Sequence, residues 1–400
     1  MRILYFCYCP EEKHFADFEK LEYFPTCVGA IVQSREFIQG LREQGIDVTV
    51  CCLVPYKHGE SQSKYVQYLA VDERYKYISY FNLPVMQEVS SFLSAYGIVK
   101  KWLKDFCEED NVILVALNNY LPVSVAVNLA KKKAVSLTYT QDLTDDLYSD
   151  FVLEQMSLAK RLLVKPYAKI TKAVAEKYNG YIYVSGKMSE KMNVLHKKPE
   201  MVLEGICEPA DKLQAMQDKK NAVMYAGSLH KKYGIRKILE TFSRIDRQDV
   251  ELWICGKGEM EDEVRRYSAR DNRIRYFGFL SHNEIIELEQ QARLLINLRD
   301  PKEEYTKYCF PGKMFDYMLS GTPVYTTRVE GIGDDYYQHL YFTNTYSEDD
   351  MSKDICSILE KEQSELDAFG NSAKDFVLNK ASRTNQAHRF IEFVKGMIRQ

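Results

Sequence analysis

Lys313 and Asp316, a lysine and an aspartate one helical turn apart, are the side chains of this sequence best suited to bind an anionic ligand. They lie in the segment CFPGKMFDYMLSGTPV (309–324), whose apolar spacing, proline and glycine predict a loop, a short helix and a strand. Gly312 lets a ligand approach the backbone, and the free N–H groups of a helix start attract negative charge. Together these groups suit a nucleoside diphosphate, with phosphate at the helix start and ribose hydroxyls at the carboxylate. The alternative interpretation is an ordinary turn with a solvated lysine and aspartate.

The elements that must position this pair follow an alternation of short apolar strands and amphipathic helices, which is the pattern of a parallel, right-handed sheet. The alternation begins at residue 2, reaches a linker at 197–199 and restarts at residue 221. A chain of 400 residues accommodates two or three domains. We therefore expect an α/β protein with two similar domains and a cleft between them.

The composition is that of an ordinary globular protein, with 46% hydrophobic residues and a net charge of −3, and this charge argues against a nucleic-acid partner. Ten cysteines are scattered without a CxxC pair, which predicts reduced, buried thiols of a cytosolic protein rather than disulfides or a zinc site. The first residues predict a strand rather than a signal peptide, and we expect no membrane-spanning segment.

Two further positions are candidate ligand contacts. Asp142 follows a predicted strand, and ligands of open α/β sheets bind beyond the carboxyl ends of the strands. Asp145 and Asp146 are more simply explained as the start of the next helix. Gly29 precedes a helix predicted at 33–44, in a loop where backbone could meet phosphate, and a structural turn is the alternative.

A basic amphipathic stretch occupies residues 158–178 and is interrupted at Pro166. A face that mixes lysines with apolar residues can rest on an anionic lipid surface. A solvated helix face is the alternative. The basic residues of this stretch are Lys160, Arg161, Lys165, Lys169, Lys172 and Lys177.

The second half of the sequence resembles the retaining glycosyltransferases of family 4. The resemblance rests on four segments in the family's order, which are YAGSLHKKYGI (225–235), LWICGKGEMED (252–262), IRYFGFLSHNEI (274–285) and FPGKMFDYMLSGTPV (310–324). The first half matches the family's acceptor-side domain more loosely. The resemblance implies the GT-B fold, in which two Rossmann-like doubly wound domains face each other across a cleft. We expect an acceptor-side domain at 1–198, completed by 380–400, and a nucleotide-sugar domain at 199–379.

The resemblance also implies roles for individual residues. Gly227 and Ser228 match the loop of the diphosphate site, Asp316 stands where the family has a glutamate bonded to ribose, and the strand edge from residue 275 to 278 matches the part that holds the base. The expected donor contacts are Gly29, Gly227, Ser228, Lys231, Arg275, Phe277, Gly278, Gly312 and Asp316. The expected catalytic residues are Lys232 and Lys313, which face the leaving diphosphate, and Asp142 on the acceptor side.

Three departures separate this sequence from the family pattern. Tyr308 occupies the place of an early glutamate, the later glutamate is shortened to Asp316, and Tyr233 replaces a lysine that often precedes the glycine at Gly234. These changes fit a branch with a YG and FPxK pattern, common among bacterial polysaccharide-assembly enzymes.

The expected activity is transfer of a hexose from a nucleoside-diphosphate sugar, UDP most of all, to a glycan or lipid-linked glycan, with retention of anomeric configuration. The expected setting is capsule or exopolysaccharide synthesis in the cytoplasm, at the inner face of the cell membrane. The chain lacks a DxD-type motif, so we expect a metal-independent enzyme without a cofactor. The alternatives are a GT-B-like partner subunit without catalysis, supported by the missing early glutamate, and a nucleotide-sugar epimerase, which would need an acid/base pair.

Overall fold

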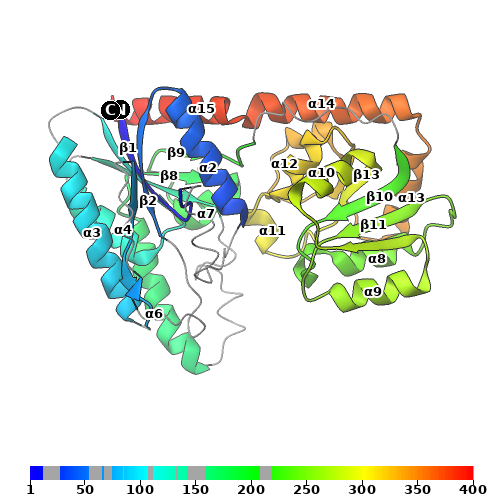
Figure 1. Ribbon diagram of the computed structural model, residues 1–400, viewed down its shortest axis with the longest axis horizontal. Coiled ribbons are helices and arrows are strands. Elements are labelled where there is room, and N and C mark those ends of the chain that lie inside the picture. Colours follow the sequence, from blue (N-terminus) through cyan, green and yellow to red (C-terminus); the bar gives the residue numbers. More distant parts are fainter. Residues whose placement is uncertain are drawn as a thin grey trace. The chain divides into compact units, whose positions relative to one another are not determined.

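The computed structural model describes residues 1–11, 28–53, 65–66, 74–83, 85–106, 111–131, 134–141, 158–207 and 219–399. The chain divides into two compact units (Figure 1), of which unit 1 comprises Met1–Ile206 with Arg383–Gln400 and unit 2 comprises Cys207–Ser382. The chain passes between the units a few residues later than the sequence suggested, at 206 rather than 198 and at 382 rather than 379.

Unit 1 is built on a seven-stranded sheet with the order β4-β2-β1-β6-β7-β8-β9, in which every neighbouring pair is parallel. Its strands read as apolar runs because helices cover both faces of a parallel sheet. The strands are β1 (Arg2–Cys7), β2 (Asp47–Cys52), β4 (Tyr75–Tyr77), β6 (Val112–Leu117), β7 (Val135–Thr140), β8 (Gly180–Tyr183) and β9 (Glu200–Val202). The strands β3 (Tyr65–Val66) and β5 (Tyr80–Phe81) form a separate antiparallel pair.

The helices of unit 1 include one that comes from the far end of the chain. They are α2 (Val28–Glu43), α3 (Met86–Phe106), α4 (Leu121–Ala130), α6 (Leu158–Ala175), the short η2 (Gly186–Met188) and α7 (Ser189–Met192), and α15 (Arg383–Ile398). Helix α15 packs beside α2 (Figure 1). None of the helices in the described part of the chain is both long enough and apolar enough to cross a lipid bilayer.

Two sequence predictions about these helices were wrong. Helix α2 begins at Val28, so Gly29 lies in its first turn and not in a loop before it. The apolar spacing extends backwards through Ala30 and Ile31, which are buried, and this lengthens the helix toward its N-terminus. Helix α6 continues through Pro166 because a proline removes only one backbone donor and can be accommodated at a local cost.

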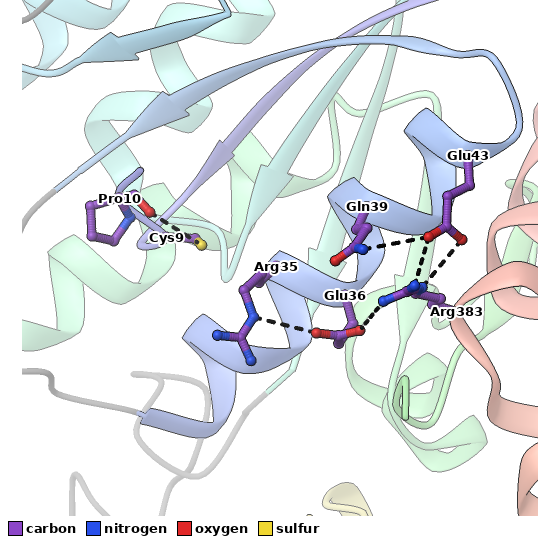
Figure 2. Close-up of polar contacts among 7 residues, drawn as sticks. All are labelled: Cys9, Pro10, Arg35, Glu36, Gln39, Glu43 and Arg383. Carbon is purple, nitrogen blue, oxygen red and sulfur yellow. Dashed lines mark hydrogen bonds and ion pairs between the residues drawn. The ribbon is translucent and has the colours of Figure 1, made fainter. Parts of the chain in front are cut away.

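The return of the chain into unit 1 is held by Arg383, the first residue of α15 (Figure 2). Its guanidinium bonds to two carboxylates of α2, with Nη2 2.7 Å from Glu43 Oε1 and Nη1 3.3 Å from Glu36 Oε2. Glu36 is buried and also receives Arg35 Nε at 3.3 Å. A Cβ added to Gly40 would lie 2.4 Å from the Arg383 carbonyl oxygen, so the two helices touch at backbone distance. Phe37 fixes the same contact by packing edge-on against Phe390.

Unit 2 is built on a six-stranded parallel sheet with the order β12-β11-β10-β13-β14-β15. Its strands are β10 (Lys220–Ala226), β11 (Glu251–Cys255), β12 (Ile274–Gly278), β13 (Ala292–Asn297), β14 (Val324–Thr327) and β15 (Tyr341–Thr343). Its helices are η3 (Lys231–Tyr233), α8 (Ile235–Phe242), α9 (Glu261–Arg270), α10 (His282–Gln291), α11 (Tyr305–Tyr308), α12 (Lys313–Leu319), η4 (Tyr336–His339), α13 (Glu348–Leu359) and α14 (Gln363–Ala381).

The strand order of unit 2 reverses direction between β10 and β13. The chain builds outward from β10 through β11 to β12, then returns to β13 on the other side of β10 and continues to β15. Ligands of open α/β sheets bind in the crevice outside the carboxyl ends of the strands at such a switch point. This topology predicts that a ligand of unit 2 binds at the loops that follow β10 and β13.

We expect Arg383→Met to lower the free energy of unfolding of unit 1 by about 1–3 kcal/mol, because it leaves the buried Glu36 carboxylate with only one cation. Gly40→Ala should also destabilise unit 1, since the added Cβ meets backbone. The chain has two tryptophans, one in each unit, so Trp102 fluorescence in a Trp253→Phe background reports urea unfolding of unit 1.

The matched control is Arg244→Met, which removes an exposed ion pair with Asp349 in unit 2. It should change the stability of unit 1 by less than about 0.5 kcal/mol. Equal effects of Arg383→Met and Arg244→Met on the Trp102 transition would contradict the role given to Arg383.

Candidate functional site

The loops that follow β10, β11 and β12 are bonded to one another through backbone at the carboxyl edge of the unit 2 sheet. Gly227 N donates to Cys255 O at 3.0 Å, and Gly256 N donates to Gly278 O at 2.8 Å. Gly256 has φ +135°, and a Cβ there would lie 1.8 Å from Gly227 O. These loops can therefore approach so closely only because position 256 has no side chain. Gly227 and Gly278 both lie at this edge, on either side of the loop after β11, and their contacts with a donor stay predictions.

Two cations meet on the same pair of tyrosine rings beside these loops. Lys232 Nζ lies 5.4 Å from the ring centre of Tyr233 and 5.9 Å from that of Tyr305. Arg299 Cζ lies 4.8 Å and 5.9 Å from the same two centres. Within the described ranges, neither cation forms an ion pair with a carboxylate. We call Lys232, Tyr233, Arg299 and Tyr305 the cation cluster.

Arg299 is a candidate site residue that the sequence analysis missed. It follows β13 after one residue, Leu298, and its Nη1 donates to Cys309 Sγ at 3.3 Å, just ahead of the segment that carries Lys313. Its Nε is buried without a hydrogen-bond partner in the described structure. The signal available in the sequence was a cation immediately after a buried strand, INLRD, at the edge where ligands bind.

Lys313 and Asp316 begin α12 on one face, as predicted, and they bind each other. Lys313 Nζ lies 2.9 Å from Asp316 Oδ2, and both side chains are partly exposed. A Cβ at Gly312 would meet nothing within 4 Å, so the backbone before the helix is open. Tyr317 ties α12 to the end of β10, because its hydroxyl accepts from Ala226 N at 2.7 Å and donates to Ala226 O at 3.0 Å.

Glu289, in the last turn of α10, is a second residue that the sequence analysis missed. It is 0% exposed, and neither carboxyl oxygen has a hydrogen-bond partner. Burial raises the pKa of Glu289 to about 8, while the Lys313 cation acts to lower that pKa and the Asp316 carboxylate to raise it. A buried carboxyl that is uncharged at neutral pH therefore lies within electrostatic range of the Lys313–Asp316 pair.

Not all of the remaining predicted donor contacts lie beside the glycine loops. Arg275 pairs with Glu251 at 3.3 Å, and Phe277 packs edge-on against Trp253. The Arg275 and Phe277 side chains line a groove of about 360 Å³ that is shared with residues at the starts of β10 and β11, away from the glycine loops. Lys231 lies in η3 beside Lys232, and its backbone N donates to Glu259 Oε1 at 2.7 Å.

Ser228 is placed in the loop by its carbonyl, which accepts from the Tyr225 hydroxyl at 2.9 Å. Gly29 belongs to unit 1, and Asp142 lies outside the described residues. Across the described ranges, no group of three or more His, Cys, Asp or Glu side chains is arranged to hold a metal ion.

Residues 220–361 match the model of the family Glycosyl transferases group 1. No curated protein matches the chain in sequence. The structure is similar to sucrose-phosphate synthase from Thermosynechococcus elongatus, with a TM-score of 0.62 and 13% identity over 100% of this chain and 99% of the other. It is also similar to the lipopolysaccharide outer core galactosyltransferase WaaB, with a TM-score of 0.60 and 12% identity over 99% of both chains.

A third similar structure is solved as trehalose-6-phosphate from E. coli bound with UDP-2-fluoro glucose, with a TM-score of 0.64 and 9% identity over 99% of both chains. At these identities the likeness concerns the fold. The two parallel-sheet α/β units have the GT-B fold, and this prediction from the sequence is confirmed.

We expect Glu289→Gln to stabilise unit 2 at pH 8 and to change little at pH 5. In the unfolded chain this carboxyl has its ordinary pKa and is ionised at any pH above that value. In the folded protein it stays protonated up to about pH 8. The wild type therefore loses stability as pH rises from about 4.5 to 8, and glutamine removes that loss. Trp253 fluorescence in a Trp102→Phe background should show a melting-temperature gain that grows by at least about 4 °C over this range.

Glu287→Gln, on the exposed face of the same helix, is the control and should show no such growth. A gain for Glu289→Gln that is the same at pH 5 and pH 8 would contradict the assignment of a neutral buried carboxyl.

Proposed function

We propose that this chain is a retaining glycosyltransferase of family 4 that transfers a hexose from a nucleoside-diphosphate sugar, with UDP favoured, to a glycan or lipid-linked glycan. The setting is the assembly of cell-surface polysaccharide such as capsule or exopolysaccharide. The observation that carries the proposal is that Lys232 and Arg299 share two tyrosine rings at the carboxyl edge of unit 2, where Arg299 also bonds to Cys309, four residues before Lys313. The match of residues 220–361 to a glycosyltransferase family supports it.

The reaction needs positive charge where the leaving group departs. The bond between the anomeric carbon and the diphosphate oxygen breaks, a bond to the acceptor oxygen forms, and the acceptor proton passes to the departing diphosphate. Negative charge grows on that diphosphate, and fixed cations aimed at it lower the barrier. The cation cluster and Lys313 supply three such charges, so the proposed transfer requires no metal and no cofactor.

Arg299 gives a physical account of one departure from the family pattern. Tyr233 stands where the family often has a lysine, and the ring of Tyr233 instead packs against the guanidinium of Arg299. Arginine offers several N–H donors in one plane and suits phosphate oxygens. We propose that Arg299 supplies the charge that a lysine at 233 would supply, and that Asp316 bonds to the ribose hydroxyls once the diphosphate engages Lys313.

We expect Arg299→Met to weaken UDP binding about 10- to 100-fold, because charge-assisted hydrogen bonds are worth about 1.5–3 kcal/mol. Isothermal titration calorimetry in EDTA measures the affinity, and uridine, which has no phosphate, should bind the variant and the wild type equally. Arg273→Met is the matched control, since Arg273 also lies over an aromatic ring, Phe242, but is paired with Asp271.

The alternatives give different results. A protein that binds no nucleoside diphosphate in EDTA or in Mg²⁺ would support the partner subunit without catalysis. Conversion of a nucleotide sugar without any acceptor would support the epimerase. Equal UDP affinity of Arg299→Met and Arg273→Met would place the phosphate elsewhere.

We further propose that unit 1 rests on the anionic inner face of the cell membrane, which would bring a lipid-linked acceptor within reach. Helix α3 exposes apolar side chains at helical spacing, with Met86 47%, Val89 54% and Leu93 60% exposed. Helix α6 exposes Lys165, Lys169 and Lys172. The two helices are joined where Tyr167 of α6 donates to Glu88 of α3 at 3.3 Å.

This combination suits an anionic membrane surface, because apolar side chains can enter the boundary of the acyl chains while lysines contact phosphate head groups. A solvated helix face explains the lysines, but it does not explain the exposed Met86, Val89 and Leu93 side chains on α3.

We expect Lys169→Gln to weaken binding to vesicles that contain phosphatidylglycerol about fivefold. The double variant Val89→Ser/Leu93→Ser should weaken it at least about tenfold through lost apolar burial. Co-sedimentation with vesicles measures both, and Leu195→Ser, at another exposed leucine of unit 1, is the control. If the wild type does not bind vesicles with anionic lipid more tightly than neutral vesicles, the proposed membrane-binding surface is wrong. If the wild type self-associates and the same variants abolish this, the surface binds a second copy of the chain.

A further inference from the structure

The carboxyl of Glu289 is a buried ionisable group near the candidate site that has no role in the proposed reaction. Its backbone carbonyl accepts from the Thr322 hydroxyl at 2.7 Å, which fixes the last turn of α10, yet both carboxyl oxygens lack a partner. Burying a carboxyl without hydrogen bonds is costly, and a chain that retains one at its functional edge requires an explanation. The Lys313 and Asp316 side chains are the charged groups that act on it.

Apart from Lys219, the other titratable groups that face Glu289 stay uncharged near neutral pH. Burial raises the pKa of the Cys255 thiol on β11 to about 12, and burial raises the pKa of the Tyr317 phenol on α12 well above its usual range. Lys219, ahead of β10, lies behind Thr322 and donates to its hydroxyl at 2.7 Å. Burial lowers the pKa of Lys219 to about 8.

Helix α10 also packs against β10 and β13. Arg293 of β13 is engaged away from the site, with Nη2 donating to Lys361 O at 2.7 Å. The remaining ionisable groups of α10, His282, Glu284 and Glu287, are exposed to solvent. Lys219 is therefore the one other group near Glu289, among the described residues, that titrates in the same pH range.

The net charge around Lys313 depends on whether Glu289 is protonated. Lys313 and Asp316 cancel each other, so this part of the site is neutral while Glu289 is protonated and carries one negative charge when Glu289 ionises. A nucleoside diphosphate is itself strongly negative, and a like charge in a buried position is poorly screened. Ionisation of Glu289 would thus oppose the diphosphate directly.

We propose that Glu289 is a positioning residue that acts through Lys313, so that the site holds a nucleoside diphosphate while the buried carboxyl is protonated and releases it as the carboxyl ionises. The proposal rests on the proposed function above. In the protonated state Lys313 is free to turn from Asp316 to the phosphate. In the ionised state Lys313 is drawn to two carboxylates, and its charge is no longer available to the ligand.

The sign and size of the effect follow from linkage between protons and ligand. Above about pH 8 the free protein loses the Glu289 proton, whereas the complex keeps it. The dissociation constant of UDP should then rise about tenfold between pH 7 and pH 9. The terminal phosphate of UDP is already ionised throughout this range.

Calorimetric titration of the full chain with UDP, at constant ionic strength from pH 7 to 9, tests the proposal. Glu289→Gln should bind UDP with an affinity that does not change with pH, and at pH 9 it should bind about tenfold more tightly than the wild type. Glu289→Met should give the same flat profile, and melting curves confirm that both variants are folded. Glu287→Gln and Lys219→Met should retain the slope of the wild type.

A slope in Glu289→Gln equal to that of the wild type overturns the proposal, and a flat profile for Lys219→Met assigns the slope to that lysine and also overturns it. A wild type that binds UDP equally at pH 7 and pH 9 contradicts this inference alone. A wild type that binds no nucleoside diphosphate at any pH contradicts both the inference and the proposed function.

Discussion

The close approach of backbone at the carboxyl edge of unit 2 is the constraint on which the candidate site depends. Gly234 has φ +78°, and a Cβ there would lie 1.8 Å from the Leu298 carbonyl oxygen. This contact brings the residue before Gly234, which is Tyr233, against the residue after Leu298, which is Arg299. Gly256 makes a similar contact with Gly227 on the next strand. A side chain at Gly234 would separate the two loops that form the cation cluster, and one at Gly256 would separate the loops after β10 and β11.

The electrostatics of the site follow from that geometry. Strand ends and backbone contacts hold Arg299 and Lys232 over shared rings with no carboxylate to neutralise them among the described residues, so their charge is available to an anion. The cation on α12 is different, because Asp316 already pairs with Lys313 and Glu289 lies within electrostatic range of both. One half of the site thus offers fixed charge, and the other half offers charge that depends on protonation.

The sequence predicted the parts of this arrangement that depend on local spacing. The alternation of strands and helices indicated two parallel α/β units, and the one-turn spacing of Lys313 and Asp316 placed both on one face of α12. The bounds of α2 were missed because a single glycine was taken for a loop, although Ala30 and Ile31 continue the apolar spacing. Local patterns record which residues share an element, and they recovered most of the fold.

The residues that the sequence did not reveal owe their roles to distant neighbours. Arg299 matters because Tyr233 and Tyr305 lie against it, and Glu289 matters because the fold buries it within electrostatic range of Lys313 and Asp316. A glutamate in the helix EIIELEQQ looks like any solvated acid until its burial is known. Such contacts form only when separate loops meet at one sheet edge, so they cannot be predicted from the spacing of residues along the chain.

The most direct measurement of the central claim is a melting curve of each unit with UDP, GDP, ADP, CDP or dTDP in EDTA. Trp253 reports unit 2 and Trp102 reports unit 1, each in a background where the other tryptophan is phenylalanine. Ligand that binds only the native state raises the melting temperature by mass action. The account predicts that one of these nucleotides raises the Trp253 transition without added metal. Melting of unit 2 that is unchanged by all five would contradict a nucleoside-diphosphate site at its carboxyl edge.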